Sequence, residues 1–441
     1  MRKLRLRPLL WVLGGVSICA GAGWFTFSKA TRFTVLPATK GDIHEIAARY
    51  LPKVEKSNLP VLGEEAFTEI ASSSDSLALI SYHSDKTPQE VRLAAAARLE
   101  PKLLALSGQF DSHILVKTSK ANFPFYTSLK GTVKLLASIS TLRAEEGKRE
   151  VAIACLEGAN SLNRLVLRSH SSWIAILVYA AMQAITDKAI VTVSKKIQLT
   201  SAELMRLSQS LPSTSQVAEG ERRAAVGEFY FIAENLLSMK SGQPPEPYYA
   251  GALDMKQTIE VLARLNGERI ANIGLPVKQR SLDFSTKVHQ RLSHLPELPE
   301  VYLEKTFPLD EDEQPAKDPT ISDQFKLLGF KRALSQIQNG VGVLFADELS
   351  LTSMDDGLLR ALTQVAGIHA YLQILRYKAV TGSYPSRLDE MAGLPKDPCS
   401  GMAFSYDRSA KRFWSVGTDG EDNGGREKMF NPGLDIVWDL P

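Results

Sequence analysis

Residues 126–168, YTSLKGTVKLLASISTLRAEEGKREVAIACLEGANSLNRLVLR, decide the fold of this chain. Apolar residues recur at three- and four-residue spacing in both halves, which is typical of helices with one buried face. Gly147 separates the halves and allows a tight turn. The segment therefore predicts an antiparallel helical hairpin. Its two apolar stripes are Leu129, Val133, Leu136, Ile139 and Leu142, and Ala152, Cys155, Leu156, Ala159, Leu162 and Val166.

Helical patterns continue on both sides of this hairpin. They predict helices at 64–80, 88–106, 216–239, 252–266, 278–293 and 355–380, and a wholly buried core helix at 173–185, which is too short to span a bilayer. Thr200 and Glu203 fit a capping box at another helix start. Three prolines predict an irregular segment at 30–60, and the acidic stretch 308–315 is typical of a flexible linker.

The composition is that of a globular chain with little overall charge. It has 441 residues, of which 44% are hydrophobic and 23% charged, enough for two or three folded units. The formal net charge is +3, and four basic residues before position 8 supply more than that. The rest is close to neutral, so we expect no nucleic-acid partner.

The N-terminus predicts a membrane anchor. Residues 9–27 carry no charge and follow the basic residues Arg2, Lys3, Arg5 and Arg7. A helix of this length crosses the hydrocarbon core, and basic flanks stay in the cytoplasm. We therefore expect a single-pass protein of a bacterial inner membrane, with its body in the periplasm. The alternative is a signal peptide cleaved near Ala20-Gly21-Ala22.

The body holds two cysteines, Cys155 and Cys399, which match no zinc-binding spacing. In an oxidising compartment they either form a disulfide or remain as two buried thiols, and we favour the thiols.

The pattern changes after Gly382. Short alternating runs at 402–406, 412–416 and 434–438 predict a small antiparallel sheet. The predicted fold is therefore mainly α: an N-terminal transmembrane helix at 1–29, an α-helical bundle or tetratricopeptide-like body at 30–354, and a small C-terminal α+β module at 355–441.

An ordered set of short motifs follows the last long helix. They are Gly382-Ser383-Tyr384-Pro385, Lys396-Asp397-Pro398 with Gly401, Asp419-Gly420, Gly424-Gly425, and Asp435-Ile436 with Trp438. This set resembles the C-terminal half of the major pseudopilin of type II secretion. The whole layout is similar to exported planctomycete- and verrucomicrobium-type proteins of unknown function. Pseudopilins carry a Glu near the start of the apolar helix, and residues 9–27 contain none, which argues against a pilus-like subunit.

The resemblance implies a calcium site in the C-terminal loop. The matching residues are Asp419, Asp422, Asn423 and Asp435, with backbone carbonyls around 415–417. Calcium takes six to eight oxygen ligands, which such a loop can supply. The alternative is that these residues only form turns, which Asp, Asn and Gly favour without any metal.

No catalytic motif is present in the sequence. The seven histidines are scattered, and neither a metalloprotease motif nor a nucleophile elbow occurs. Glu221-Arg222-Arg223 is expected to make ion pairs rather than bind an anion. We therefore expect a non-enzymatic, membrane-anchored binding or scaffold protein with an unidentified protein partner, linked to secretion or surface assembly. The alternative is an extracytoplasmic hydrolase with a site assembled from distant residues.

Overall fold

The computed structural model describes nine stretches of the chain: residues 33–54, 59–80, 86–115, 123–169, 172–239, 251–298, 320–349, 355–426 and 435–441. The predicted membrane segment 9–27 and the predicted linker 308–315 lie outside these residues. The structure is mainly helical, with a three-stranded antiparallel sheet near the C-terminus, as the sequence predicts.

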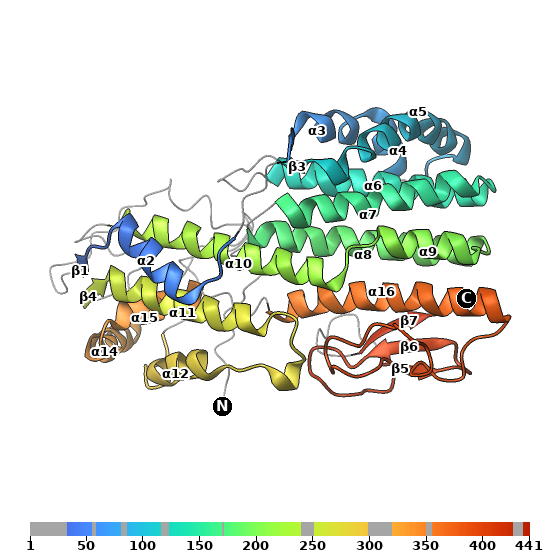
Figure 1. Cartoon of the computed structure of the whole chain (residues 1–441). Coiled ribbons are helices and arrows are strands. Elements are labelled where there is room, and N and C mark those ends of the chain that lie inside the picture. Colours follow the sequence, from blue (N-terminus) through green and yellow to red (C-terminus); the bar gives the residue numbers. More distant parts are fainter. Residues whose placement is uncertain are drawn as a thin grey trace.

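The predicted hairpin lies in the helical layers of the right-hand half of Figure 1. It consists of helices α6 (Phe123–Glu145) and α7 (Arg149–Ser169). Gly147 joins them with a φ of 75°, a left-handed conformation that strains residues with a Cβ. All eleven residues of the two stripes are buried. The prediction of a helical hairpin is confirmed.

Helix α8 (Trp173–Lys196) packs against both helices of the hairpin. At 24 residues it is longer than predicted, and among the described helices it alone is long and apolar enough to cross a membrane. Length therefore does not separate a membrane span from a core helix here. Burial does: Tyr179, Gln183 and Asp187 are enclosed by protein. Helix α8 is therefore a core helix, but the prediction that it is buried on all sides is wrong, because Ala181 and Ala184 are exposed.

Two capping boxes fix the starts of the next helices. Thr200 and Glu203 cap α9 (Ser201–Ser210) reciprocally, as predicted. Ser213 and Gln216 do the same for α10 (Thr214–Leu236), which begins two residues earlier than expected. In each box a side chain accepts a hydrogen bond from a backbone N–H that the first helical turn leaves free.

One face of the hairpin is covered by α3 (Glu65–Ala71), α4 (Ser74–Ile80) and α5 (Gln89–Ser107) (Figure 1). The single helix predicted at 64–80 is in fact two. Ser73 separates them, because its hydroxyl donates to the Ile70 carbonyl and accepts from the Ser76 N–H. Serine competes in this way with the backbone bonds of a helix. A short parallel pair, β2 (Val61–Leu62) and β3 (Ile114–Leu115), borders this layer.

The prediction of an irregular segment at 30–60 is wrong for most of its described part. Strand β1 (Phe33–Leu36) pairs in parallel with β4 (Gly251–Asp254), and helix α2 (Lys40–Tyr50) follows it. Thr39 and Asp42 form a capping box at the start of α2. Pro37 precedes that box, so it delimits the helix rather than preventing it.

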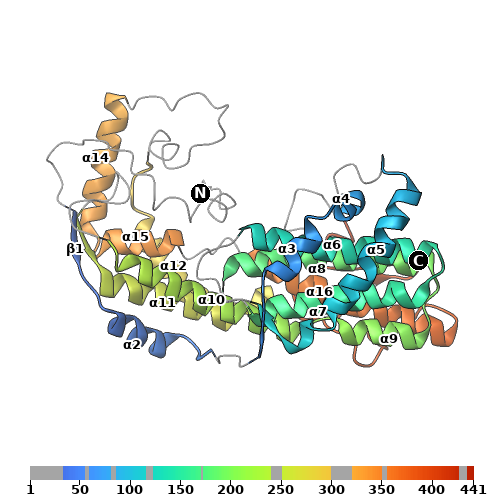
Figure 2. The same ribbon diagram turned by 90° about the horizontal axis from the view of Figure 1, so that it is seen from above.

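Four further helices complete this end of the molecule (Figure 2). They are α11 (Met255–Asn272), α12 (Asp283–Leu292), α14 (Ile321–Gln336) and α15 (Gly340–Leu349). The sequence predicts α11 and α12 with shifted ends and misses α14 and α15. Leu327, Phe330 and Leu334 of α14 pack with β4 and α15 in a small separate core.

The C-terminal segment begins with α16 (Asp355–Thr381) and carries the sheet β5 (Ser405–Asp407), β6 (Arg412–Ser415) and β7 (Ile436–Asp439). The strand order is β5-β6-β7, fully antiparallel, as predicted. Phe413 and Trp438 stack with ring centroids 5.1 Å apart. Helix α16 contacts α8 and α9 on one side and β6 and β7 on the other (Figure 1). One apolar cluster therefore includes side chains of α7, α8, α9, α16 and the sheet.

Cys155 and Cys399 are both buried and unpaired, so they form no disulfide with each other. Burial raises the pKa of Cys155 to about 12 and that of Cys399 to about 11. The prediction of two buried thiols is confirmed, and both thiols stay protonated at neutral pH.

Candidate functional site

The C-terminal loop places Asn423 within hydrogen-bond distance of both Asp419 and Asp435, but the three predicted carboxylates do not converge on one point. Asp422 accepts hydrogen bonds from the Trp414 indole, the Ser405 hydroxyl and the Gly424 N–H, each at 2.9 Å. Burial alone raises the pKa of Asp422, but these hydrogen bonds outweigh it and leave the pKa below its ordinary value. Asp422 therefore ties the loop to β5 and β6.

Asp435 is almost fully buried at the start of β7. Its two carboxylate oxygens accept the N–H groups of Asn423, at 3.2 Å, and Gly425, at 2.7 Å. Burial raises its pKa, and these two hydrogen bonds offset only part of that rise. Asp419 lies at the surface and accepts from the Glu421 N–H at 3.0 Å.

Both readings of this loop remain open. The carboxylates of Asp422 and Asp435 already order the turn through N–H donors, as the turn interpretation requires. A carboxylate has about four acceptor directions, so each could also face a cation. Within the described stretches, no group of three His, Cys, Asp or Glu side chains converges in a way that could hold a metal. A calcium ion would depend largely on backbone carbonyls, and calcium binding stays a prediction.

Asp397 is the central carboxylate of this module, and sequence reasoning assigned it no role beyond its place in the Lys396-Asp397-Pro398 motif. It is buried and accepts the Ser415 hydroxyl, the Ser400 hydroxyl and the N–H of Cys399. The N–H of Val416 also points to it, at 3.3 Å. Asp397 thereby holds the Asp-Pro loop against the end of β6. Its position directly before a proline in a polar turn is the signal that could have found it.

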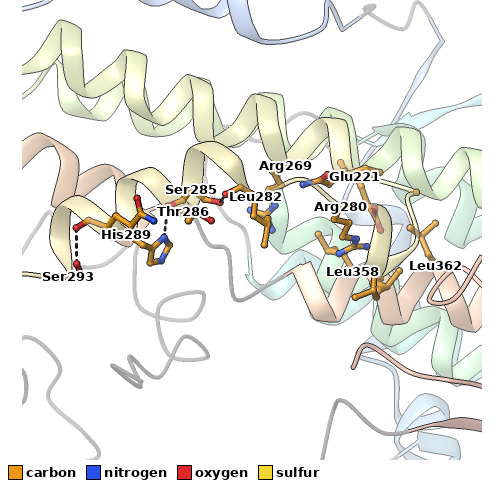
Figure 3. A pocket seen from close by; sticks show the side chains of 16 residues that line it. Glu221, Arg269, Arg280, Leu282, Ser285, Thr286, His289, Ser293, Leu358 and Leu362 are labelled. Carbon is orange, nitrogen blue, oxygen red and sulfur yellow. Dashed lines mark hydrogen bonds between the residues drawn. The ribbon is translucent and has the colours of Figure 1, made fainter. Parts of the chain in front are cut away.

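A second feature, absent from the sequence predictions, is a cavity of about 540 Å³ where the two ends of the molecule meet. Its walls come from α10, α11, the 273–282 connection, α12 and the first turns of α16 (Figure 3). Leu358, Leu359 and Leu362 of α16 form an apolar wall. The end of the cavity next to these leucines is charged, with Glu221, Arg269 and Arg280. The opposite end holds His289 and Ser293. A cavity of this size and composition is typical of small-molecule sites.

The connection between α11 and α12 is fixed by hydrogen bonds. The Asn272 side chain exchanges two of them with the backbone of Ser281, at 2.6 and 3.0 Å, which closes the connection into a loop. The Val277 N–H donates to the Cys399 carbonyl at 3.0 Å, which joins the loop to the C-terminal module. The cavity wall is therefore held in place by contacts on both sides.

Arg269 contributes to this wall from α11. Its guanidinium lies over the Trp173 ring, 3.9 Å from the centroid, so the side chain has a defined position. The nearby arginines Arg222 and Arg223 do not line the cavity. They donate hydrogen bonds to backbone carbonyls of other elements. Arg223 donates to the carbonyls of Leu167 and Arg168 at the end of α7. Both arginines also lie within 4 Å of Glu219 on the same helix, so these ion pairs are local, and the contacts across the body go to carbonyls instead.

His289 lines this cavity, and its surroundings are relevant to the hydrolase alternative. Its Nδ1 lies 2.8 Å from the Ser285 carbonyl, and its Nε2 lies 3.7 Å from an Asp347 carboxylate oxygen. A general base needs a ring nitrogen that faces the hydroxyl it activates. Nδ1 is hydrogen-bonded to a carbonyl, whereas the 3.7 Å from Nε2 to Asp347 is too long for a hydrogen bond, so this geometry does not by itself decide against the hydrolase alternative.

A buried polar row crosses the interface of α7 and α8. Asn163 donates to Gln183 at 2.9 Å, and Gln183 donates to Asp187 at 2.7 Å. Burial raises the pKa of Asp187 to about 8, although the hydrogen bond from Gln183 opposes the rise. In the sequence, the only signal for this row is the presence of two polar residues, Tyr179 and Gln183, in an apolar helix.

Comparisons with known proteins give no relative: no family model, no curated protein and no solved structure matches this chain.

Proposed function

We propose that this chain is a membrane-anchored extracytoplasmic binding or scaffold protein, linked to secretion or surface assembly. Residues 9–27 would form the transmembrane anchor, with a cytoplasmic N-terminus and a periplasmic body. The hairpin of α6 and α7 would be the tetratricopeptide-like unit of that body. The module at 355–441 would be the pseudopilin-like part, with calcium bound near Asp419, Asp422, Asn423 and Asp435.

One observation carries this proposal. The C-terminal module shares an apolar cluster with α7, α8 and α9, so the body presents it rigidly. The cavity beside it is lined by leucines and by polar groups of fixed position, among them Arg269 and Asn272. An apolar wall with a few fixed polar groups suits the recognition of a ligand.

The topology is tested with cysteine labelling in intact cells. Both body cysteines are buried, so a single new thiol at the exposed position Ala410 gives a clear label. A membrane-impermeant maleimide should modify the Ala410→Cys variant after the outer membrane is permeabilised. The matched variant Lys3→Cys should react only after lysis. Labelling of both, or of Lys3→Cys alone in intact cells, would contradict the proposed orientation.

The partner is tested by crosslinking in the membrane, followed by purification of the full-length chain in detergent. Recovery of a stoichiometric envelope protein would support the scaffold proposal. The hydrolase alternative rests on His289 and Asp347 beside Ser285 and Thr286. Ester hydrolysis that disappears in His289→Asn, with no protein recovered, would favour that alternative.

A further inference from the structure

We propose that the cavity between α10, α11, α12 and α16 binds a small amphipathic anion, an alkyl chain with a carboxylate head. This inference is independent of the protein partner proposed above. It rests on the chemistry of the walls and on one arginine in particular.

Arg280 is the cation of the cavity without a carboxylate partner. Its Nε donates to the Leu275 carbonyl at 3.2 Å, which fixes the side chain at the cavity wall. Across the described stretches, no carboxylate lies within ion-pair distance of its guanidinium. Other arginines of the body have such partners; Arg143, for example, binds Glu100 at 2.6 Å. A half-buried guanidinium held by one carbonyl keeps several N–H donors for an oxyanion.

The apolar part of the proposed ligand has a matching surface. Leu358, Leu359 and Leu362 line the cavity next to Arg280, as Figure 3 shows for Leu358 and Leu362. Val277 and Leu282 extend this surface from the connecting loop. A cavity of about 540 Å³ is within the range that encloses most of a small organic ligand.

The charges on the walls favour an anion over a cation. Arg269 interacts electrostatically with Glu228, and Glu221 lies on the same wall, so the positive charge left for a ligand is that of Arg280. The wall is also preorganised, because Arg222 donates to the Ile273 carbonyl and Asn272 closes the loop that carries Arg280. Groups that are already ordered lose little entropy when a ligand binds.

The test is calorimetric titration of the full-length protein in an uncharged maltoside detergent. The probes are octanoate, octylammonium and acetate, which separate the head from the chain. We expect octanoate to bind about tenfold more tightly than octylammonium, because only one head pairs with Arg280. Acetate should bind much more weakly than octanoate, since it lacks the apolar chain.

Arg280→Glu is the decisive variant, because it should reverse the preference between octanoate and octylammonium. Arg280→Gln is a second variant that keeps a donor for the Leu275 carbonyl and should weaken octanoate about tenfold. Arg280→Lys should keep the preference for octanoate. An unchanged preference in folded Arg280→Glu or Arg280→Gln protein would overturn the proposal, and so would the absence of octanoate binding to the unaltered protein.

Discussion

Replacing Asp187 by Asn should stabilise the protein, increasingly so as the pH rises. The pKa of Asp187 is about 8 in the folded protein, because the side chain is buried between α7 and α8. In the unfolded chain its pKa is the ordinary value of 3.8. Above pH 4 the unfolded chain therefore loses a proton that the folded protein keeps. Stability is unaffected below both pKa values and falls as the pH rises between them, and the loss is complete at about pH 8.

The magnitude follows from the shift. One pKa unit corresponds to about 1.4 kcal/mol, so ionisation in the unfolded state costs the folded protein about 4 kcal/mol at pH 7. Asn carries no charge in either state and can still accept the hydrogen bond from Gln183. Asp187→Asn should therefore be more stable by up to about 4 kcal/mol at pH 7 and nearly unchanged near pH 4.

Urea unfolding of the full-length protein, followed by circular dichroism between pH 4 and pH 8, measures this difference. The matched control is Asp111→Asn. Burial tends to raise the pKa of Asp111, but pairing with Arg164 outweighs it and leaves the pKa lowered, so the control should lose stability at neutral pH. A difference between Asp187→Asn and the unaltered protein that does not change with pH would refute the reasoning.

Three further outcomes are expected. Gly367→Ala should lower the free energy of unfolding by about 1–3 kcal/mol in thermal unfolding, because a Cβ there would lie 2.0 Å from the Trp438 ring. The control is Gly357→Ala in the same helix, whose Cβ meets nothing within 4 Å, so it should be neutral or stabilising. Glu203→Gln should lower the free energy of unfolding by about 1–3 kcal/mol at pH 7, because the ion pair with Arg149 of α7 lowers the pKa of Glu203 to about 2. The stability that this pair contributes is present above pH 4.5 and is lost as the pH falls toward 2. Calcium should raise the melting temperature of the full-length protein, and Asp419→Ala should remove the rise; no calcium response in the unaltered protein would eliminate the predicted site.

Periodic patterns in the sequence predicted the centre of the fold well. The hairpin of α6 and α7, helix α16 and the terminal sheet all bury one regular face, so spacing alone indicated them. The capping box of α9 was also visible, because two residues three positions apart determine it. Such local signals need no knowledge of the rest of the chain.

The missed elements depend on distant partners. Strands β1 and β4 pair across more than 200 residues, and each has only four residues. Helix α14 packs in a small separate core with β4, whereas α15 lies against α11 and adds Val343 and Ala346 to the main core. The cavity could not be predicted for the same reason: Arg280, Glu221 and Leu358 come from three distant parts of the sequence. Only the folded chain brings them together.

Helix α16 also determines which shorter versions of this protein can exist. Its first turns line the cavity, and its remaining length lies between the bundle and the terminal sheet. A chain that stopped before residue 355 would leave leucines of α9 and valines of α8 facing water. Such a fragment should aggregate rather than persist as a smaller soluble protein, so dissection at this point would give two insoluble halves of a single cooperative structure.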